Sequence, residues 1–273
     1  MLTQGALFAI FAAGWDVMAG YVGLISFGQA AFVGAGAYAA AYLSPVLPAA
    51  VVVAAAAVVA MAVAAVMGAP TLRLRGIYLG VVTFAFPLIL QQLMYVFQRF
   101  GGGEQGRPVA VTLPPLQLYY SAVVLMAISL ALIGLIVRSR VGLVFRAVRE
   151  DEVTAASAGN NVVAYKLAAF LISAAFTGAA GAVYAMYLGN AFPDLFDVGL
   201  SVQILTMGVI GGLGTIAGPA LGGFGLAILN QFLVATGPFQ DLIYAVLLVV
   251  IVVIAPRGIL GGARTVLARL GAR

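Results

Sequence analysis

Long stretches without a single charged residue constrain this 273-residue chain more than any other feature. A helix needs about 20 apolar residues to cross the hydrocarbon core of a membrane. Six charge-free runs are long enough or nearly so, and they cover 17–72, 76–98, 108–137, 167–193, 198–240 and 242–256. With 64% hydrophobic and 8% charged residues, the chain lies outside the composition of soluble domains. The sequence therefore predicts an all-α integral membrane protein.

Turns and glycine-rich breaks divide these runs into about eight or nine transmembrane or re-entrant helices. Ser44-Pro45 splits the first run, and Gly211-Gly212-Leu213-Gly214 followed by Gly218-Pro219 interrupts the run from 198 to 240. We expect segments near 5–20, 22–43, 46–68, 77–98, 116–137, 167–189, 200–214, 216–236 and 239–256. Together they form a single transmembrane domain over residues 1–273.

The positions of Lys and Arg predict the orientation, because cytoplasmic loops hold an excess of both. Loops 69–76 and 138–166 and the tail from 257 hold eleven of them, against Arg99 and Arg107 opposite. We expect the cation-rich side, with the C-terminus, to face the cytoplasm, and the 99–115 loop and the 190–199 turn to face outside. The net charge of +5 then reflects membrane topology, and no nucleic-acid partner is expected.

Groups for catalysis are missing from the sequence. The chain has no His to serve as a base and no Cys to form a thiolate or a disulfide. Apart from Glu150-Asp151-Glu152 the acids are scattered, so no metal cluster is predicted. Gly101-Gly102-Gly103-Glu104 is not a phosphate-binding loop, because no Lys follows it. We expect a protein that is not an enzyme, with no catalytic residue, no metal and no cofactor of its own.

Two glycine-interrupted segments predict a translocation path. Leu24–Gly28 followed by Gly34-Ala35-Gly36 is similar to Val209–Gly214 followed by Gly222-Gly223, which forms a weak internal repeat. Paired broken segments point to a transport site between repeats. The alternative is that these glycines only allow helices to pack closely. The candidate path residues are Gly23, Ser26, Gly28, Gln29, Gly211, Gly212 and Gly214.

Polar residues inside the predicted spans also have two interpretations. For Asp16, beside Trp15, the cost of a buried charge favours an interfacial or helix-packing role over a role in substrate or proton transfer. For the uncharged polar residues the default is hydrogen bonding between helices, with substrate contact as the alternative. These residues are Gln29, Gln91, Gln92, Gln203 and Asn230.

A charged island runs from Arg138 to Lys166 between two predicted spans. Within it, Arg149-Glu150-Asp151-Glu152 leads into an alanine-rich stretch that stops at Gly159. This pattern predicts a short helix with an acidic start, a small-residue surface and a glycine end, which suits close approach by another protein. The alternative is a solvated connector, for which the 29 residues of the island are many.

Four motifs resemble motifs in the permeases of branched-chain amino acid ABC importers, specifically those of the M-type subunit, and they follow one another in the same order along the chain. The similarity extends from about Trp15 to Gly261. Asp16 and Gln29 stand where that family often has Asn and His, and the island matches only loosely the Glu-Ala-Ala-x-x-x-Gly pattern of other importers. The motifs are Gly20–Tyr38, Leu72–Tyr78, Arg146–Glu152 and Gly211–Pro219.

The resemblance implies a permease of the bacterial cytoplasmic (inner) membrane for branched-chain or related small amino acids. Its implied partners are a second related permease, two cytoplasmic ATPases that use ATP, and a periplasmic or lipid-anchored solute-binding protein. It also implies that 152–159 is a coupling helix that fits a groove on an ATPase. The residues of that contact would be Glu150, Asp151, Glu152, Ala155, Ala156 and Gly159.

Other functions stay open. Permeases similar to this class carry urea, short amides and other small organic solutes. An autonomous ion-coupled transporter or channel would need carboxylates inside the membrane, and only Asp16 is available. A structural membrane anchor does not explain the charged island.

Overall fold

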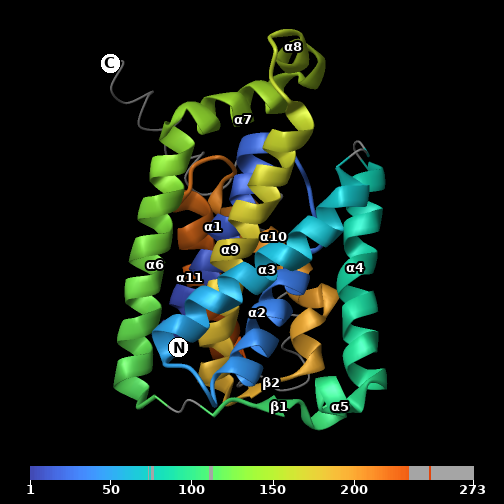
Figure 1. Ribbon diagram of the computed structural model, residues 1–273. Coiled ribbons are helices and arrows are strands. Elements are labelled where there is room, and N and C mark those ends of the chain that lie inside the picture. The colour runs from blue at the N-terminus through green and yellow to red at the C-terminus, as the bar shows by residue number, and fades with distance from the viewer. Residues whose placement is uncertain (73, 75–76, 111–112, 234–245, 247–273) are drawn as a thin grey trace, which may run out of the picture.

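The protein is a bundle of helices that run between two ends (Figure 1). The computed structural model describes residues 1–72, 74, 77–110, 113–233 and 246. Predicted segment 239–256 and the tail from 257 lie outside the described residues. The helices are α1 (Leu2–Asp16), η1 (Val17–Val22), α2 (Gln29–Leu43), α3 (Ala49–Thr71), α4 (Ile77–Val96), α5 (Gln98–Gly101), η2 (Gly103–Gln105), α6 (Pro115–Arg138), α7 (Arg140–Glu150), α8 (Glu152–Ser157), α9 (Val162–Leu188), η3 (Pro193–Phe196), α10 (Val198–Gly211) and α11 (Ala217–Leu233).

Five helical stretches in the described part of the chain are long and apolar enough to cross a membrane. They are Leu2–Val22, Ala49–Thr71, Tyr78–Val96, Pro115–Arg138 and Val162–Leu188. The helices α2, α10 and α11 have 15, 14 and 17 residues, fewer than the roughly 20 that a full crossing requires. The all-α membrane fold is confirmed, and the helix after the Gly211 break is matched by a second short helix after Gly28.

The centre of the bundle is α1 with η1, in which residues 5–22 are all buried, and α9 is mostly buried beside it. In contrast, α3, α4 and α6 turn most of their residues outward. The outward side chains are apolar, as Val58, Ile89 and Leu135 illustrate. Apolar side chains on the outer surface are suited to contact with lipid. Helices are stable there because they satisfy their own backbone hydrogen bonds.

Small residues bring α9 close to α2 and α3. A Cβ atom added at Gly178 would lie 2.3 Å from the Cβ of Ala60, and one at Gly181 would lie 2.4 Å from the carbonyl oxygen of Val33. On α2, a Cβ at Gly36 would lie 2.0 Å from the carbonyl oxygen of Gly178. Only residues without larger side chains permit such approach, which is how helices commonly associate in membranes.

The two ends of the bundle differ in the loops that they carry. The strand β1 (Arg107–Pro108) pairs antiparallel with β2 (Asn190–Ala191) and joins the two loops predicted to be external. The helices α7 and α8 lie at the opposite end (Figure 1), where Leu72 borders the same cavity as Glu152. The predicted sorting of these loops into two ends is confirmed, while the cytoplasmic assignment of the α8 end stays a prediction.

Two predicted boundaries are wrong. The segment 22–43 is helical only from Gln29, because residues 23–28 form a non-helical break. The island is mostly helix, and α9 begins at Val162, where the side chain of Asn161 accepts a hydrogen bond from the backbone N–H of Ala164 at 3.1 Å. This cap starts the helix before Lys166, which is therefore a buried helix residue and not a loop residue.

Candidate translocation and coupling site

The break between η1 and α2 is held by side chains. Gly23 ends η1 in the left-handed conformation with φ of 80°, a geometry that favours glycine. The indole N–H of Trp15 donates to the carbonyl oxygen of Ser26 at 2.9 Å, and the N–H of Gly28 donates to the hydroxyl of Ser26 at 3.1 Å. Irregular backbone at membrane depth requires such internal partners.

Hydroxyl groups from two other helices accept one N–H of the break, from Phe27, and one N–H in the first turn of α2, from Ala30. The N–H of Phe27 donates to Thr83 Oγ1 of α4 at 3.1 Å, and the N–H of Ala30 donates to Ser201 Oγ of α10 at 2.9 Å. A helix leaves its first four N–H groups without partners in the helix itself. These contacts therefore tie the start of α2 to α4 and α10.

Gln29 extends this buried polar cluster to α9. Its Nε2 donates to Thr177 Oγ1 at 2.6 Å and to Ser173 Oγ at 3.2 Å. Beside it, a Cβ added at Gly28 would lie 2.5 Å from the methyl carbon of Met67. The side chain of Gln29 thus makes the interhelical hydrogen bonds expected of it, and the surroundings of Gly28 are closely packed.

Asp16 fastens the second glycine break, the turn between α10 and α11. Its side chain is fully buried, and its carboxyl oxygens accept hydrogen bonds from the N–H of Gly214 at 2.8 Å and of Ile216 at 3.4 Å. A Cβ added at Gly20 would lie 1.9 Å from Asp16 Oδ1, so glycine is required there. The structure gives Asp16 a helix-packing role and not an interfacial one.

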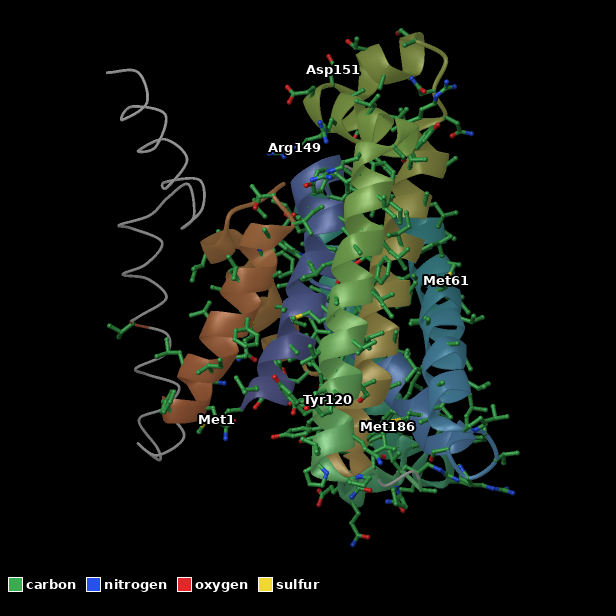
Figure 2. The ribbon with its side chains drawn as sticks, turned by 90° about the vertical axis from the view of Figure 1, so that its left-hand side faces the viewer. Met1, Met61, Tyr120, Arg149, Asp151 and Met186 are labelled. Carbon is green, nitrogen blue, oxygen red and sulfur yellow. The ribbon has the colours of Figure 1, made fainter. Side chains whose placement is uncertain are left out.

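Arg149, near the end of α7, reaches both breaks. Its Nη1 donates to the carbonyl oxygen of Gly20. A Cβ added at Gly23 would lie 3.2 Å from Arg149 Cγ, and one at Gly214 would lie 3.2 Å from Arg149 Nη1. Figure 2 shows Arg149 at the end of α1 and Asp151 farther out. The sequence alone predicted no contact for Arg149, although its place just before the acidic run was a signal.

The predicted path residues fall into two groups that the structure keeps apart. Gly23 and Gly214 meet at Arg149, whereas Gly28 and Gln29 lie among α3, α4 and α9. Gly211 and Gly212 form the tight turn itself, and a Cβ at Gly211 would lie 2.0 Å from the carbonyl oxygen of Gly218. Close packing is therefore a sufficient reason for glycine at 211.

The internal repeat is limited to the order of the elements, and the two halves pack differently. In each half, a helix precedes a break that contains a left-handed glycine, Gly23 or Gly214, and a short helix follows. In the second half α11 folds back against α10, and it also packs along α1. In the first half α2 packs mainly on α9 and α3 and barely contacts α1.

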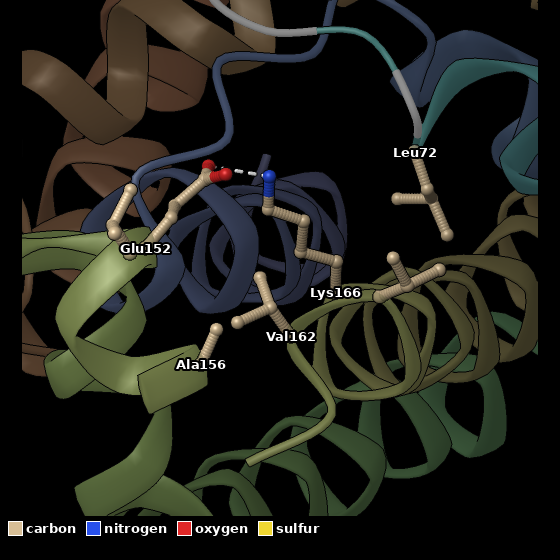
Figure 3. Close-up of a pocket in the computed structure, with 7 residues that line it drawn as sticks. Leu72, Glu152, Ala156, Val162 and Lys166 are labelled. Carbon is tan, nitrogen blue, oxygen red and sulfur yellow. Dashed lines mark hydrogen bonds and ion pairs between the residues drawn. The ribbon is translucent and has the colours of Figure 1, made fainter. Parts of the chain in front are cut away.

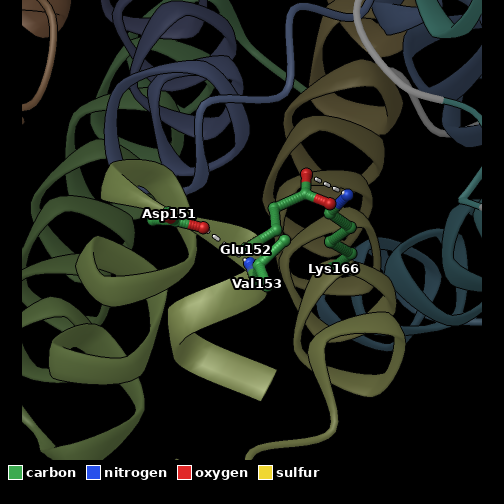
Figure 4. Close-up of polar contacts among 4 residues, drawn as sticks. All are labelled: Asp151, Glu152, Val153 and Lys166. Carbon is green, nitrogen blue, oxygen red and sulfur yellow. Dashed lines mark hydrogen bonds and ion pairs between the residues drawn. The ribbon is translucent and has the colours of Figure 1, made fainter. Parts of the chain in front are cut away.

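The short helix α8 begins and ends where the sequence predicts. Asp151 caps it, because Oδ1 accepts from the N–H groups of Val153 at 2.7 Å and Thr154 at 3.2 Å (Figure 4). Gly159 follows it with φ of 85°, and the N–H of Asn160 donates to the carbonyl oxygen of Ala155 at 3.3 Å. This is the glycine stop expected of a helix end.

One predicted contact residue of α8 is wrong. Ala155 is buried, so its side chain is not available to a partner protein. A helix of six residues that lies on the protein body must turn one face inward, and Ala155 is on that face. Glu150, Asp151, Ala156 and Gly159 are exposed.

Glu152 points toward the protein body and forms an ion pair with Lys166 of α9 (Figures 3 and 4). The pair borders a cavity of about 370 Å³ between α8, the start of α9 and Leu72. Lys166 was not among the predicted site residues. An acid in the charged island and a Lys in the first turns of an apolar helix were the signals for this contact.

A polar hollow lies at the opposite end of the bundle. It has a volume of about 520 Å³ and is lined by Tyr95, Gln98, Gly102, Gly103, Glu104 and Gln105. The hydroxyl of Tyr95 donates to Asp194 Oδ1 at 2.6 Å, which ties α4 to η3 at its edge. Among the described residues, no group of three His, Cys, Asp or Glu side chains is arranged to hold a metal ion.

A buried core of packed helices, two glycine breaks and an exposed short helix at one end define a multi-pass membrane protein of the transport type. Residues 1–255 match the family described as "Branched-chain amino acid transport system / permease component". The chain belongs to this family, and it is a transport permease subunit.

Individual relatives agree with the family. The chain is 29% identical over 291 residues to the high-affinity branched-chain amino acid transport system permease protein LivM of Salmonella typhimurium. The aligned region covers 94% of this chain and 68% of that protein. The similarity to LivM of Escherichia coli (strain K12) has the same extent. LivH of Escherichia coli (strain K12) is 33% identical over 135 residues, covering 48% of this chain and 43% of that protein. No solved structure matches the chain.

Proposed function

We propose that the chain is the M-type permease subunit of an ATP-binding-cassette importer and carries branched-chain or related small amino acids across the bacterial inner membrane. One observation carries this proposal. Arg149, three residues before the start of the exposed helix α8, contacts Gly20 and borders Gly23 and Gly214, so it links the α8 end directly to both glycine breaks. Such a link can transmit the movement of a bound ATPase to the transport path.

The substrate class rests on the family and on the names of the relatives, which are branched-chain amino acid permeases. The buried hydroxyls around the start of α2 fit the passage of a polar molecule. Thr83, Ser173, Thr177 and Ser201 come from three different helices and already serve as hydrogen-bond acceptors there. A substrate that presents its own polar groups can exchange with them when the break opens.

The two ends of the bundle suggest where the partners would bind. One of two cytoplasmic ATPases, which use ATP, would bind the exposed surface formed by α8 and the residues just after it, chiefly Ala156 and Gly159, and the permease itself would bind no cofactor. A second related permease would complete the path. A periplasmic or lipid-anchored binding protein would deliver substrate at the end with the 520 Å³ hollow. In this arrangement the α8 end and the C-terminus face the cytoplasm.

An autonomous ion-coupled transporter is less well supported, because Asp16, the acid buried within α1, already accepts two backbone N–H groups of the α10–α11 turn. The importer proposal is tested by purification of the tagged chain from its native membrane in mild detergent. We expect a second permease and two ATPase subunits to be retained, with ATP hydrolysis in the purified sample. Ala156→Trp should lose the ATPases and keep the second permease. A chain that purifies alone and transports leucine without ATP would contradict the proposal.

A further inference from the structure

The ion pair between Glu152 and Lys166 occupies an unusual place in the bundle. Lys166 lies in the apolar helix α9 and its side chain is 3% exposed, while that of Glu152 is 29% exposed. Burial of an ammonium group is costly unless an opposite charge faces it. Glu152 supplies that charge from α8, so the pair is a charged link between the short helix and the membrane-spanning core (Figure 4).

Two cavities meet at this pair. The larger, of about 370 Å³, lies between α8 and the start of α9 and is lined by Leu72, Val153, Ala156, Val162 and Val163 (Figure 3). The smaller, of about 110 Å³, is lined by Gly23, Leu24, Ile25, Leu74 and Leu79 and therefore borders the first glycine break. Glu152 and Lys166 are the residues that line both cavities.

Each cavity joins the pair to a different element. The smaller cavity borders the pair and Gly23–Ile25, and the larger one borders the pair and the exposed helix α8. A cavity that holds one water needs about 10–15 Å³, so both spaces can be hydrated. Among the described residues, the walls are apolar apart from the two charged side chains and the glycine.

We propose that Glu152 and Lys166 line the translocation path at the α8 end and form its gate. While the ion pair is closed, it divides the two cavities. When a bound ATPase moves α8 away from α9, the pair parts and the cavities join. An amino-acid zwitterion then finds a cation for its carboxylate and a carboxylate for its ammonium group, so that neither buried charge is left unpaired during passage. This inference rests on the proposed function, and it identifies the point at which the substrate leaves the translocation path.

A reversible bridge between the two positions tests the gate. The chain has no native Cys, so Glu152→Cys and Lys166→Cys can be combined without background. A short bifunctional methanethiosulfonate reagent is preferable to a direct disulfide, since Glu and Lys side chains together span more than a disulfide allows. In proteoliposomes with the partner subunits, the bridge should abolish uptake of radiolabelled leucine, and a reductant should restore it. The double-Cys variant treated with a monofunctional methanethiosulfonate reagent is the control, and the difference between its uptake and that of the bridged variant measures the effect of the bridge alone.

A neutral pair gives an independent measurement. Replacement of a buried ion pair by neutral side chains of similar size is often tolerated, so Glu152→Gln with Lys166→Met should insert and assemble. Leucine preloaded into the proteoliposomes should then leak out without ATP about tenfold faster than with the parent chain, the factor that corresponds to about 1.4 kcal/mol of lost closure. Arg138→Gln, which removes an exposed charge at the same end, should leave the leak unchanged.

The outcomes separate the gate from the proposed function. If the parent chain with its partners takes up no leucine with ATP present, the proposed function fails. If the parent transports leucine, then equal uptake with the bridge in place, or an unchanged leak in the neutral variant, overturns the gate and leaves the importer intact. Blocked uptake that a reductant restores, together with the faster leak, supports it.

Discussion

The interface of α3 and α9 permits a quantitative test of close packing at Gly178. In the Gly178→Ala variant the new Cβ would lie 2.3 Å from the Cβ of Ala60 and 3.0 Å from the carbonyl oxygen of Ala56. Ordinary contacts of a Cβ atom lie at 3.4–4 Å. The two helices must therefore separate locally by about 1 Å, because the obstacles are a short side chain and backbone rather than a flexible side chain.

The expected cost follows from two opposing effects. Overpacking of a well-packed interface destabilises by about 1–3 kcal/mol. Replacement of a helical Gly by Ala recovers about 0.5–1 kcal/mol of backbone entropy. Overpacking is the larger effect, so the variant should be less stable. For a chain of this size, each kcal/mol of lost stability typically lowers the thermal midpoint by about 2–4 °C. We expect the thermal midpoint to fall by a few degrees.

The assay is thermal unfolding in detergent, followed by the loss of the monodisperse peak in size-exclusion chromatography. Gly134→Ala is the matched control, because Gly134 lies in helix α6 and an added Cβ there meets no atom within 4 Å. This control should be as stable as the parent or slightly more stable. Equal midpoints for Gly178→Ala and Gly134→Ala would refute the close packing of α9 on α3 at this position.

Three further predictions concern the turn, the short helix and the topology. Asp16→Ala should lower the thermal midpoint, because each buried N–H left without its acceptor costs about 1–3 kcal/mol, and Asp16→Asn should lower it less because the amide keeps one acceptor oxygen. A midpoint for Asp16→Ala equal to that of the parent would show that the turn does not depend on this carboxyl group. Ala156→Trp should abolish substrate-stimulated ATP hydrolysis, whereas Asp151→Asn should change it little, because a helix-end charge at an exposed site is worth about 0.3–1 kcal/mol; normal stimulation in Ala156→Trp would make the island a plain connector. Thr154→Cys should resist an impermeant thiol reagent in intact cells and Glu104→Cys should react, and the reverse pattern would invert the orientation.

Much of the fold could be predicted because hydropathy and charge are local properties of the chain. The charge-free runs located α3, α4, α6 and the body of α9 within a few residues of their observed ends. The acidic run Glu150–Glu152 marked the start of α8 and Gly159 its stop for the same reason, since helix ends depend on neighbours in sequence, while the capping role of Asp151 comes from the structure. These features need no knowledge of tertiary contacts.

The site could be predicted only in part, because its contacts join distant parts of the chain. Asp16 and Gly214 are separated by 198 residues, and Arg149 and Gly20 by 129. Lys166 looked like a boundary cation, and its burial follows from the position of Glu152 on the folded island. Ala155 looked exposed because a six-residue helix shows too few residues to reveal its buried face.

The most direct test of the account is leucine uptake by proteoliposomes that contain the chain, its partner permease and the two ATPases, with the binding protein added outside. Uptake should require ATP on the ATPase side and the binding protein on the other, and omission of either should reduce it to the level of empty liposomes. Uptake of urea or a short amide in place of leucine would change the substrate class while keeping the mechanism. Saturable leucine uptake by this chain alone, without ATP, would contradict the account.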